Sequence, residues 1–326
     1  MKSDEIRKKM DELRSLAAAE RPDIGEDLDR LSEKLLRNHE EPPDAWNRVT
    51  LARNAGRPTT LDYLEVIADD FLELHGDRAF GDDPALVGGI ARIDGIFFTV
   101  IGHQKGRNMK ENLRRNYGMA HPEGYRKALR LARQAEKFRR PVLTFIDTPG
   151  AYPGLAAEER GIGEAIARNI KELSILRTPV ISVIIGEGGS GGALGIAVAD
   201  RVLMLENAVY SVISPEGFAS ILLRDAKQAK YAASLMKLTA TDIYGFGIAD
   251  EVIPEPPGGA HTDPAYAAGR IKRSVLRHYH ELAGKRIETL LAERSRRIRN
   301  LDSFPRQVPA APGLLRRIFG AGGRRP

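Results

Sequence analysis

The chain of 326 residues contains no cysteine. It therefore has no disulfide framework, no thiol nucleophile and no cysteine-ligated zinc site. No apolar stretch approaches the ~20 residues that a membrane-spanning helix needs. The charged start, MKSDEIRKKMDELR, also lacks the apolar segment of a signal peptide. These absences predict a cytoplasmic protein that is not inserted in a membrane.

Aromatic residues are scarce, at 6% of the chain with a single tryptophan, and positive charge is unevenly placed. The formal net charge is +6, but residues 270–326 carry fifteen Lys/Arg against four Asp/Glu. Residues 1–269 are therefore at about −5, and the basic character belongs to the C-terminal segment. Nucleic acid is not an expected partner.

The N-terminal part of the chain predicts three helices. Residues 3–18 and 26–38 show charged amphipathic patterns, and a third helical pattern runs from about residue 60 to residue 75. Thr59, with Asp62 three residues later, would cap this third helix. Its apolar stripe is Leu64, Ile67, Phe71 and Leu74.

From residue 86 onward, strand patterns alternate with helix patterns. Buried strands are expected at residues 87–93, 96–101, 142–147, 180–186, 201–206, 209–213 and 251–254. Helices are expected at residues 122–138, 157–177, 192–199, 215–223 and 226–237. This order indicates a layered α/β core over residues 56–262. The flanking parts would be an N-terminal helical arm (1–55), a basic helical extension (263–302) and a disordered basic tail (303–326).

Residues 186–195, GEGGSGGALG, fit two patterns that depend on a cofactor or a side chain. Their glycines match G-x-G-x-x-G, with Glu206 about 20 residues further on, as in NAD-binding dehydrogenases. Ser190 also stands in the G-x-S-x-G of hydrolases, followed in order by Asp250 and His261. However, Asp200-Arg201 interrupts the helix that a dinucleotide site needs, and His261 lies in a Pro/Gly linker.

The same segment fits a third pattern, a site made of backbone alone. A buried strand would end near residue 186, a glycine turn would follow, and a helix would begin near Gly191. Such a turn points N–H groups at whatever lies over the helix N-terminus, where the helix dipole also favours negative charge. This arrangement is that of an oxyanion hole, and we favour it over the two alternatives.

Two further segments carry possible function. Residues 145–154, FIDTPGAYPG, contain the D-T-P-G of GTPases, but the chain has no G-x-x-x-x-G-K-[ST] loop. Gly150 and Gly154 would instead let the backbone approach a ligand. The basic residues of segment 102–118, among them Lys105 and Arg107, could bind phosphates or face a partner.

The motifs VGGIARIDG, IGHQKGR, RRNYGMAHPEGYRKALRLA, TFIDTPGAYPG, VIIGEGGSGGALGIAVAD and YSVISPEG stand in this order between residues 46 and 261. Together they resemble the alpha subunits of bacterial acetyl-CoA carboxylase carboxyltransferases. The resemblance implies a crotonase-type fold, a spiral of ββα units. It also implies carboxyl transfer from carboxybiotin, held on a separate carrier protein, to acetyl-CoA. The product would be malonyl-CoA for fatty-acid biosynthesis, with another short acyl-CoA as the alternative acceptor.

The resemblance assigns roles to particular residues. In the family a Gly-Gly backbone pair holds the ureido oxygen of biotin, which becomes negative as the carboxyl group leaves; these positions are Gly191 and Gly192 here. Since helix N-terminal positions tolerate alanine, we expect a Gly192→Ala protein to fold normally. Lys105 and Arg107 would contact CoA phosphates or the partner, and no metal or covalently bound cofactor is expected. The substrate cavity would be lined by Gly150, Ala151, Tyr152, Pro153, Gly154, Gly188, Gly189 and Ser190.

The resemblance also implies partners. The family's beta subunit carries a cysteine zinc ribbon, and a chain without cysteine cannot supply it, so the ribbon must lie on a second polypeptide. A biotin carboxyl carrier protein and a biotin carboxylase, which alone uses ATP, would complete the enzyme. The expected assembly is an alpha2beta2 heterotetramer, and this chain would be active only together with the beta subunit.

Overall fold

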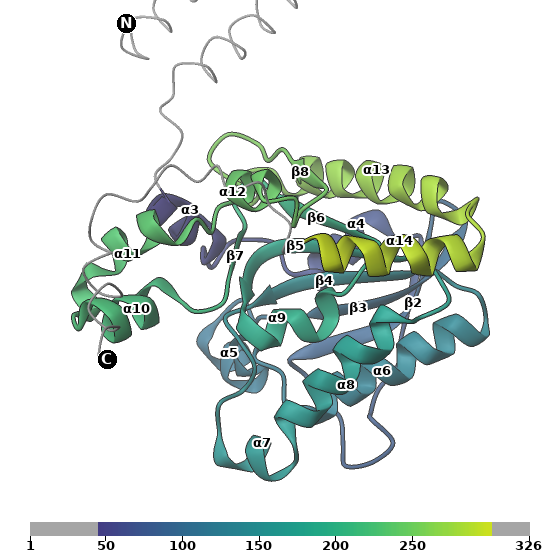
Figure 1. The fold of residues 1–326 in the computed structure, drawn as a ribbon, viewed down its shortest axis with the longest axis horizontal. Coiled ribbons are helices and arrows are strands. Elements are labelled where there is room, and N and C mark those ends of the chain that lie inside the picture. The colour runs from purple at the N-terminus through teal and green to yellow at the C-terminus, as the bar shows by residue number, and fades with distance from the viewer. Residues whose placement is uncertain (1–44, 302–326) are drawn as a thin grey trace, which may run out of the picture.

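The computed structural model describes residues 45–301, and eight strands of this part form a single sheet (Figure 1). The sheet order is β1-β2-β3-β4-β5-β6-β8, and β7 pairs with the end of β5. The pairings β1–β2 and β2–β3 are antiparallel and the others are parallel. The strands are β1 (Asp70–Glu73), β2 (Leu86–Ile93), β3 (Ile96–His103), β4 (Val142–Thr148), β5 (Val180–Gly189), β6 (Arg201–Leu205), β7 (Val209–Ser211) and β8 (Glu251–Ile253).

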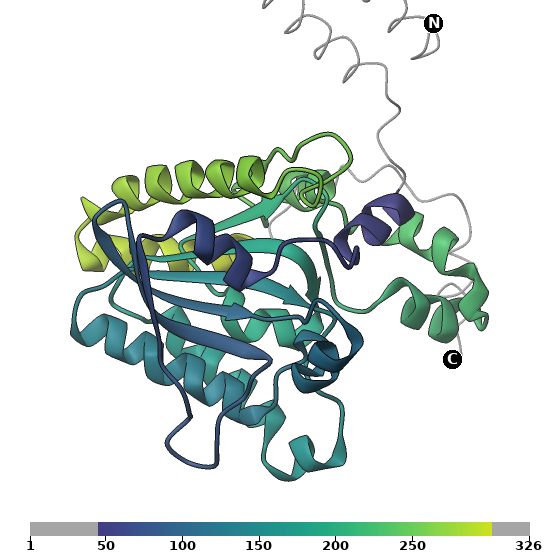
Figure 2. The ribbon, with the colours of Figure 1, turned by 180° about the vertical axis from the view of Figure 1, so that it is seen from behind.

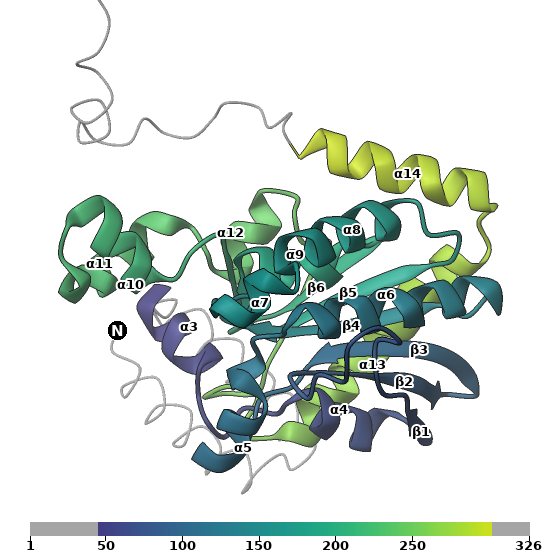
Figure 3. The ribbon, with the colours of Figure 1, turned by 90° about the horizontal axis from the view of Figure 1, so that it is seen from below.

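Helices cover both faces of this sheet (Figures 1 and 3). On one face α6 (Pro122–Lys137), α8 (Ile162–Ser174) and α9 (Ser190–Ala197) pack together, and on the other α4 (Thr60–Ile67) packs with α13 (Pro264–Ala283). Every residue of β4 and β5 is buried, because helices cover both faces of these central strands. The remaining helices of the body are α5 (Met109–Arg114), α7 (Leu155–Glu159), α12 (Ala240–Gly245) and α14 (Ile287–Asn300).

A small helical lobe, residues 212–237, stands beside the body (Figures 1 and 2). It contains α10 (Pro215–Phe218), η3 (Ala219–Leu223), η4 (Ala226–Gln228) and α11 (Ala229–Met236), and α11 packs on α3 (Ala45–Ala52). A small apolar cluster, separate from the main core, joins the lobe to α3 and to the start of β7. Its buried members are Val49, Ala52, Val209, Ala233 and Leu238.

All seven predicted strands are present, but the helix predicted over residues 60–75 is wrong beyond Ile67. The carboxylate of Asp62 accepts hydrogen bonds from the N–H and the hydroxyl of Thr59, at 2.9 and 2.8 Å, as the expected cap requires. The chain then turns extended at Ala68, and Asp70–Glu73 form β1 on the edge of β2. Gly89 allows this pairing, because a Cβ there would lie 2.0 Å from the Leu72 carbonyl oxygen.

The helix predicted over residues 157–177 is divided into α7 and α8 by Gly161, which has a left-handed φ of +78°. The basic region 264–299 forms α13 and α14, whose residues Ile271 and Leu290 belong to the same hydrophobic core as the sheet. The helices predicted at 3–18 and 26–38 and the tail predicted at 303–326 lie outside the described residues. Between residues 45 and 301, no helix has both the length and the apolar character needed to cross a bilayer.

Candidate active site

The glycine-rich segments meet at the carboxyl ends of two neighbouring parallel strands, β4 and β5. After β4 the chain enters the loop 149–154 and then α7, whereas after β5 it passes directly into α9. The carboxyl ends of adjacent strands in such sheets are where ligands usually bind. The structure thus brings the segments 150–154 and 188–192 together, as the sequence predicted.

The glycine turn expected after residue 186 does not exist, because β5 continues to Gly189 and α9 begins at Ser190. Glu187, Gly188 and Gly189 pair with β7 instead of forming a loop. The glycines allow close packing: a Cβ at Gly188 would lie 2.4 Å from the Tyr210 ring, and one at Gly189 would lie 2.1 Å from the Pro149 carbonyl oxygen.

This geometry removes the dinucleotide alternative. Gly186 and Gly188 of the fingerprint lie inside a strand, whereas a pyrophosphate site needs them in the turn that opens a helix. A Cβ at Gly186 would lie 2.4 Å from the Asp147 carboxylate, so this glycine makes room for a side chain of the protein itself.

The hydrolase alternative fails for a different reason. Asp250 accepts a hydrogen bond from the N–H of Val202 at the start of β6, whereas Ser190 follows the far end of the parallel strand β5. Val202 pairs with Ser182 of β5, and Ser190 lies eight residues further along the chain. At the usual rise per strand residue this places Ser190 and Asp250 roughly 26 Å apart along the strand direction. His261 lies 3.4 Å from the Asn54 amide, and Asp250 contacts Arg297 instead.

The first turn of α9 presents Gly191 and Gly192. Helices leave the N–H groups of this turn without an intrahelical acceptor, and neither N–H bonds to another segment of the described chain. Ser190, just before them, is exposed and has a left-handed φ of +50°. The turn therefore combines free donors with the positive end of a helix dipole, which suits a negatively charged oxygen.

The two glycines differ in the space around them. A Cβ at Gly191 would meet nothing nearer than Ile166, at 3.8 Å, whereas one at Gly192 would lie 2.4 Å from the backbone carbon of Gly150 and 2.5 Å from the Ala151 nitrogen. The expectation that Gly192→Ala folds normally is therefore wrong, because the loop after β4 occupies the space that the methyl group would need. Gly191 is the position where a methyl group fits.

The loop 149–154 is held at both ends. The Thr148 hydroxyl donates to the Gly150 carbonyl at 2.6 Å and accepts from the Gly150 N–H at 3.1 Å. The Tyr152 N–H donates to the Ala120 carbonyl at 3.1 Å, and the Tyr152 ring lies 4.1 Å from the His121 ring, measured between centroids. Pro153 is exposed and Gly154 precedes α7, so the loop forms a wall next to the glycines of α9.

A buried charged network lies beneath these glycines, and no sequence motif had indicated its acidic members, Asp147 and Glu187. The Lys105 ammonium lies 2.7 Å from Asp147 and 2.9 Å from Glu187, and Arg53 lies 2.7 Å from the other oxygen of Glu187. Burial opposes charge on Glu187, but the two cations outweigh it and hold the pKa of Glu187 below its usual range. The sequence did contain a sign of this network, because Asp147 and Glu187 interrupt the apolar runs FIDTPG and VIIGEGG. A carboxylate in a buried strand needs a charged or hydrogen-bonding partner.

Lys105 and Arg107, expected to meet phosphates or a partner, differ in their surroundings. Lys105 already has two carboxylate partners, and burial, which alone would lower its pKa, is outweighed by Asp147 and Glu187, so its pKa is raised. Arg107 is mostly exposed and pairs with Asp62. No group of three or more His, Asp or Glu side chains between residues 45 and 301 is arranged to hold a metal ion.

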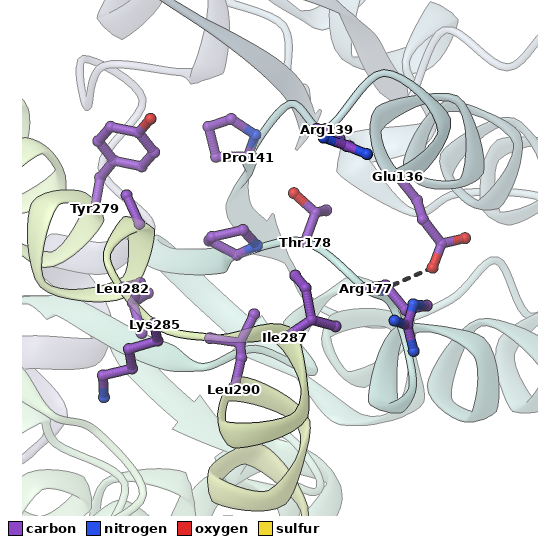
Figure 4. A pocket seen from close by; sticks show the side chains of 12 residues that line it. Glu136, Arg139, Pro141, Arg177, Thr178, Tyr279, Leu282, Lys285, Ile287 and Leu290 are labelled. Atoms are coloured by element: carbon purple, nitrogen blue, oxygen red, sulfur yellow. Dashed lines mark hydrogen bonds between the residues drawn. The ribbon is translucent and has the colours of Figure 1, made fainter.

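A cavity of about 440 Å³ lies away from the glycines (Figure 4). Pro141 and Pro179, which precede β4 and β5, place it at the opposite end of these strands. Leu282, Ile287 and Leu290 line one side, and the Glu136 carboxylate on the other accepts a hydrogen bond of 2.8 Å from the Arg177 N–H. It contains none of the predicted site residues.

Comparison with known proteins adds to this geometry. Residues 1–302 match the family model described as acetyl co-enzyme A carboxylase carboxyltransferase-like. The chain is 55% identical over 295 residues to the acetyl-coenzyme A carboxylase carboxyl transferase subunit alpha of Treponema denticola, covering 90% of this chain and 96% of the relative. It is 54% identical over 303 residues to the subunit of the same name from Thermus thermophilus, covering 92% and 96%.

Two solved structures share the fold at low sequence identity. The transcarboxylase 12S core, with methylmalonyl-coenzyme A bound, has a TM-score of 0.60 and 21% identity, covering 75% of this chain and 45% of that one. A chain of a Pseudomonas malonate decarboxylase hetero-tetramer in complex with coenzyme A has a TM-score of 0.58 and 19% identity, covering 74% and 97%. The predicted crotonase-type α/β fold is confirmed.

Proposed function

This chain belongs to the family of acetyl-CoA carboxylase carboxyltransferases, and we propose that it acts as the alpha subunit of such an enzyme, forming malonyl-CoA from acetyl-CoA. The carboxyl group would come from carboxybiotin on a separate biotin carboxyl carrier protein. A biotin carboxylase would reload the carrier and would be the only component that uses ATP.

The observation that carries this proposal is the first turn of α9. When the carboxyl group leaves biotin, negative charge develops on the ureido oxygen, and the free N–H groups of Gly191 and Gly192 would donate to it. The helix dipole adds to this stabilisation. The biotin anion can itself accept a proton from the acetyl methyl group, so the reaction needs no protein base, and stabilisation of the developing oxyanions is what the protein must supply.

The remaining site residues would shape the cavity around these donors. The wall formed by Gly150, Ala151, Tyr152, Pro153 and Gly154 would confine the biotin ring, together with Gly188, Gly189 and Ser190. Arg107, which is exposed and follows the carboxyl end of β3, would meet a CoA phosphate or the partner subunit. Lys105 would bind a phosphate only by giving up its ion pair with Asp147 or with Glu187.

A partner subunit is part of the proposal. The relatives are named as subunits, and one structural neighbour is a hetero-tetramer. We propose a beta subunit with a zinc ribbon, which a chain without cysteine cannot contain, and an alpha2beta2 assembly. The purified chain alone should therefore form no malonyl-CoA from carboxybiotin and acetyl-CoA, and turnover by the chain alone would contradict the divided site.

The sharpest test of the backbone site is Gly191→Ala in the assembled enzyme. The added methyl group has room in the protein but stands where the ureido oxygen must approach, so we expect carboxyl transfer to fall by about 10²-fold, the size typical of a disturbed oxyanion hole. Gly269→Ala in α13 is the matched control, since it also adds a methyl group in open space on a helix. Wild-type turnover in an assembled Gly191→Ala enzyme would refute the backbone mechanism.

Gly192→Ala is the complementary variant. Here the methyl group meets the loop 149–154, so we expect loss of activity together with lower thermal stability. Substituting propionyl-CoA for acetyl-CoA in the same assay tests the acceptor, and a higher kcat/KM with propionyl-CoA would favour the alternative of a different short acyl-CoA.

A further inference from the structure

The helix α9 has little of its own that fixes its first turn. It is eight residues long, SGGALGIA, with no side-chain hydrogen bond from its N-cap residue Gly189 and no acidic residue in the first turn. Glycine is also the residue with the greatest backbone freedom. The direction of the Gly191 and Gly192 N–H groups must therefore be set by neighbouring elements.

Tyr125 of α6 makes a side-chain hydrogen bond to one of these two glycines. Its hydroxyl donates a hydrogen bond of 3.2 Å to the Gly192 carbonyl, and its side chain is fully buried. Its ring lies against the helix at Gly195, where a Cβ would be only 2.6 Å from the ring edge. One turn further along, the buried Asn169 amide of α8 donates to the Gly195 carbonyl at 3.0 Å.

The other polar group beneath α9 is His103 of β3. Its imidazole is completely buried and faces the backbone of Gly192 and Phe145. Neither ring nitrogen has a hydrogen-bond partner among the described residues. His103 therefore lies against the Gly192 backbone without a well-formed hydrogen bond, whereas the Tyr125 hydroxyl makes one to the Gly192 carbonyl.

We propose that Tyr125 is a positioning residue for carboxyl transfer: by holding the Gly192 carbonyl, its hydroxyl sets the direction of the N–H groups that receive the oxyanion. A peptide unit is planar, so holding the Gly192 oxygen fixes the unit that joins Gly192 to Ala193. This unit meets the one that carries the Gly192 N–H at the Gly192 Cα, and it limits how the first turn of α9 can rotate. Misplacement of a reacting contact by about 1 Å can cost 10²-fold in rate, so an indirect hold of this kind matters. The inference rests on the function proposed above.

The test compares Tyr125→Phe with Tyr63→Phe in the enzyme assembled with its partner subunit. Both variants keep a buried ring and lose one hydroxyl, but the Tyr63 hydroxyl has no hydrogen-bond partner in the described chain and lies on α4, across the sheet from α9. We expect Tyr125→Phe to lower kcat about tenfold with unchanged KM for acetyl-CoA and for the carboxylated carrier, a loss typical of removing outer support from a reactive group. Tyr63→Phe should remain within about twofold of wild type in kcat, less than the effect of a supporting contact.

Amide hydrogen exchange on the unassembled chain gives a second measurement that does not depend on activity. Peptides covering residues 189–197 should exchange faster in Tyr125→Phe than in Tyr63→Phe, because only the first variant releases α9. A kcat within twofold of wild type for Tyr125→Phe, an equal loss in Tyr63→Phe, or a loss that appears in KM alone would overturn the positioning role. Gly191→Ala separates the two proposals: if it lowers kcat and Tyr125→Phe does not, only the positioning role fails, whereas wild-type turnover in Gly191→Ala refutes the oxyanion hole itself.

Discussion

The body and the lobe of this protein differ in where they place their apolar side chains. In the body, β4 and β5 are buried along their whole length between two layers of helices. In the lobe, residues 212–237, most large apolar side chains face solvent: Val212 is 80% exposed, Ile221 67% and Leu222 50%. Apolar surface of this kind is typical of interaction sites rather than of a folding core. The proposed donors belong to the body, so their geometry is set by the part that packs internally.

The two regions are connected by few contacts, and these are partly ionic. Arg53, which directly follows α3, bridges Glu187 of β5 and Glu216 of α10, each at 2.7 Å. The body, in contrast, extends through α14, which the buried Arg294 holds to the end of α8 and to the segments that lead into β5 and β6. We therefore expect substitutions in the body to cost much more free energy of unfolding than substitutions in the lobe, and four variants test this difference from the largest effect to the smallest.

The largest loss should come from Arg294→Ala in α14. The Arg294 guanidinium is fully buried, lies 2.6 Å from Asp200, and donates to the carbonyls of Leu173, Leu176 and Thr178. Removing it leaves a buried carboxylate without its cation, which typically costs about 3–5 kcal/mol. Denaturant unfolding of the chain measures this, with the exposed Arg299→Ala on the same helix as control. Equal stability of the two variants would show that α14 does not belong to the body.

The next effect is the dependence of stability on pH that His103 imposes. Burial lowers the pKa of His103 to about 3, whereas in the unfolded chain the imidazole takes up a proton below its ordinary value of 6.5. Acid therefore favours the unfolded chain, and stability from this group falls as pH drops from 6.5 towards 3. One pKa unit corresponds to about 1.4 kcal/mol, so lowering the pH from 6.5 to 4.5 should cost about 2–3 kcal/mol.

The measurement is the difference between wild type and His103→Asn, because other groups titrate in the same range. Burial raises the pKa of Asp83 to about 6, which has the opposite effect on stability as pH falls. Subtracting the two unfolding free energies at pH 6.5 and at pH 4.5 leaves the histidine contribution. Identical pH slopes for the two proteins would mean that the His103 ring is solvated in the native state.

These residues also show how far sequence reasoning reaches. The strands β2 to β6 were predicted to within a few residues because each is a continuous apolar run, which local composition reveals. The helix predicted through Phe71 and Leu74 was wrong, although the spacing of these residues continues the apolar stripe of α4. The segment forms a strand because it pairs with β2, where Glu73 lies opposite Gly89, 16 residues later in the sequence. Propensity and periodicity carry no information on such a pairing.

The candidate site was predicted in the same partial way. The glycines of segments 150–154 and 186–192 stand out in the sequence, and the structure brings them together. The expected glycine turn was wrong. Glycine is needed at position 189 because the Pro149 carbonyl packs against it, and Pro149 lies in the loop after β4, far away in the sequence. Tyr125 and Asn169 were missed for a similar reason, since a buried tyrosine or asparagine in an amphipathic helix gives no sign of the distant carbonyl that it bonds.

A smaller loss is expected from Arg53→Ala, which cuts the ionic link between body and lobe. Glu187 keeps Lys105 as a partner, and the pair with Glu216 is partly exposed, so the cost should be about 1 kcal/mol. Arg168→Ala, which breaks an exposed pair with Glu164 on α8, is the control and should change stability by less than about 0.5 kcal/mol. A loss from Arg53→Ala as large as that from Arg294→Ala would mean that body and lobe unfold as one unit.

The smallest effect should come from Ile221→Ser in the lobe. The Ile221 side chain is 67% exposed, so little apolar surface is returned to water when it is replaced. Surface substitutions away from caps, cavities and buried charges usually stay within about 0.5 kcal/mol, and we expect that range for the unfolding free energy of the isolated chain. Ala233→Ser, in the buried cluster where the lobe meets α3, is the matched control, because it places a hydroxyl group where no water reaches. If Ile221→Ser destabilises the chain more than Ala233→Ser does, the Ile221 side chain must be buried in the folded chain. The contrast between an apolar lobe surface and an internally packed body would then be wrong.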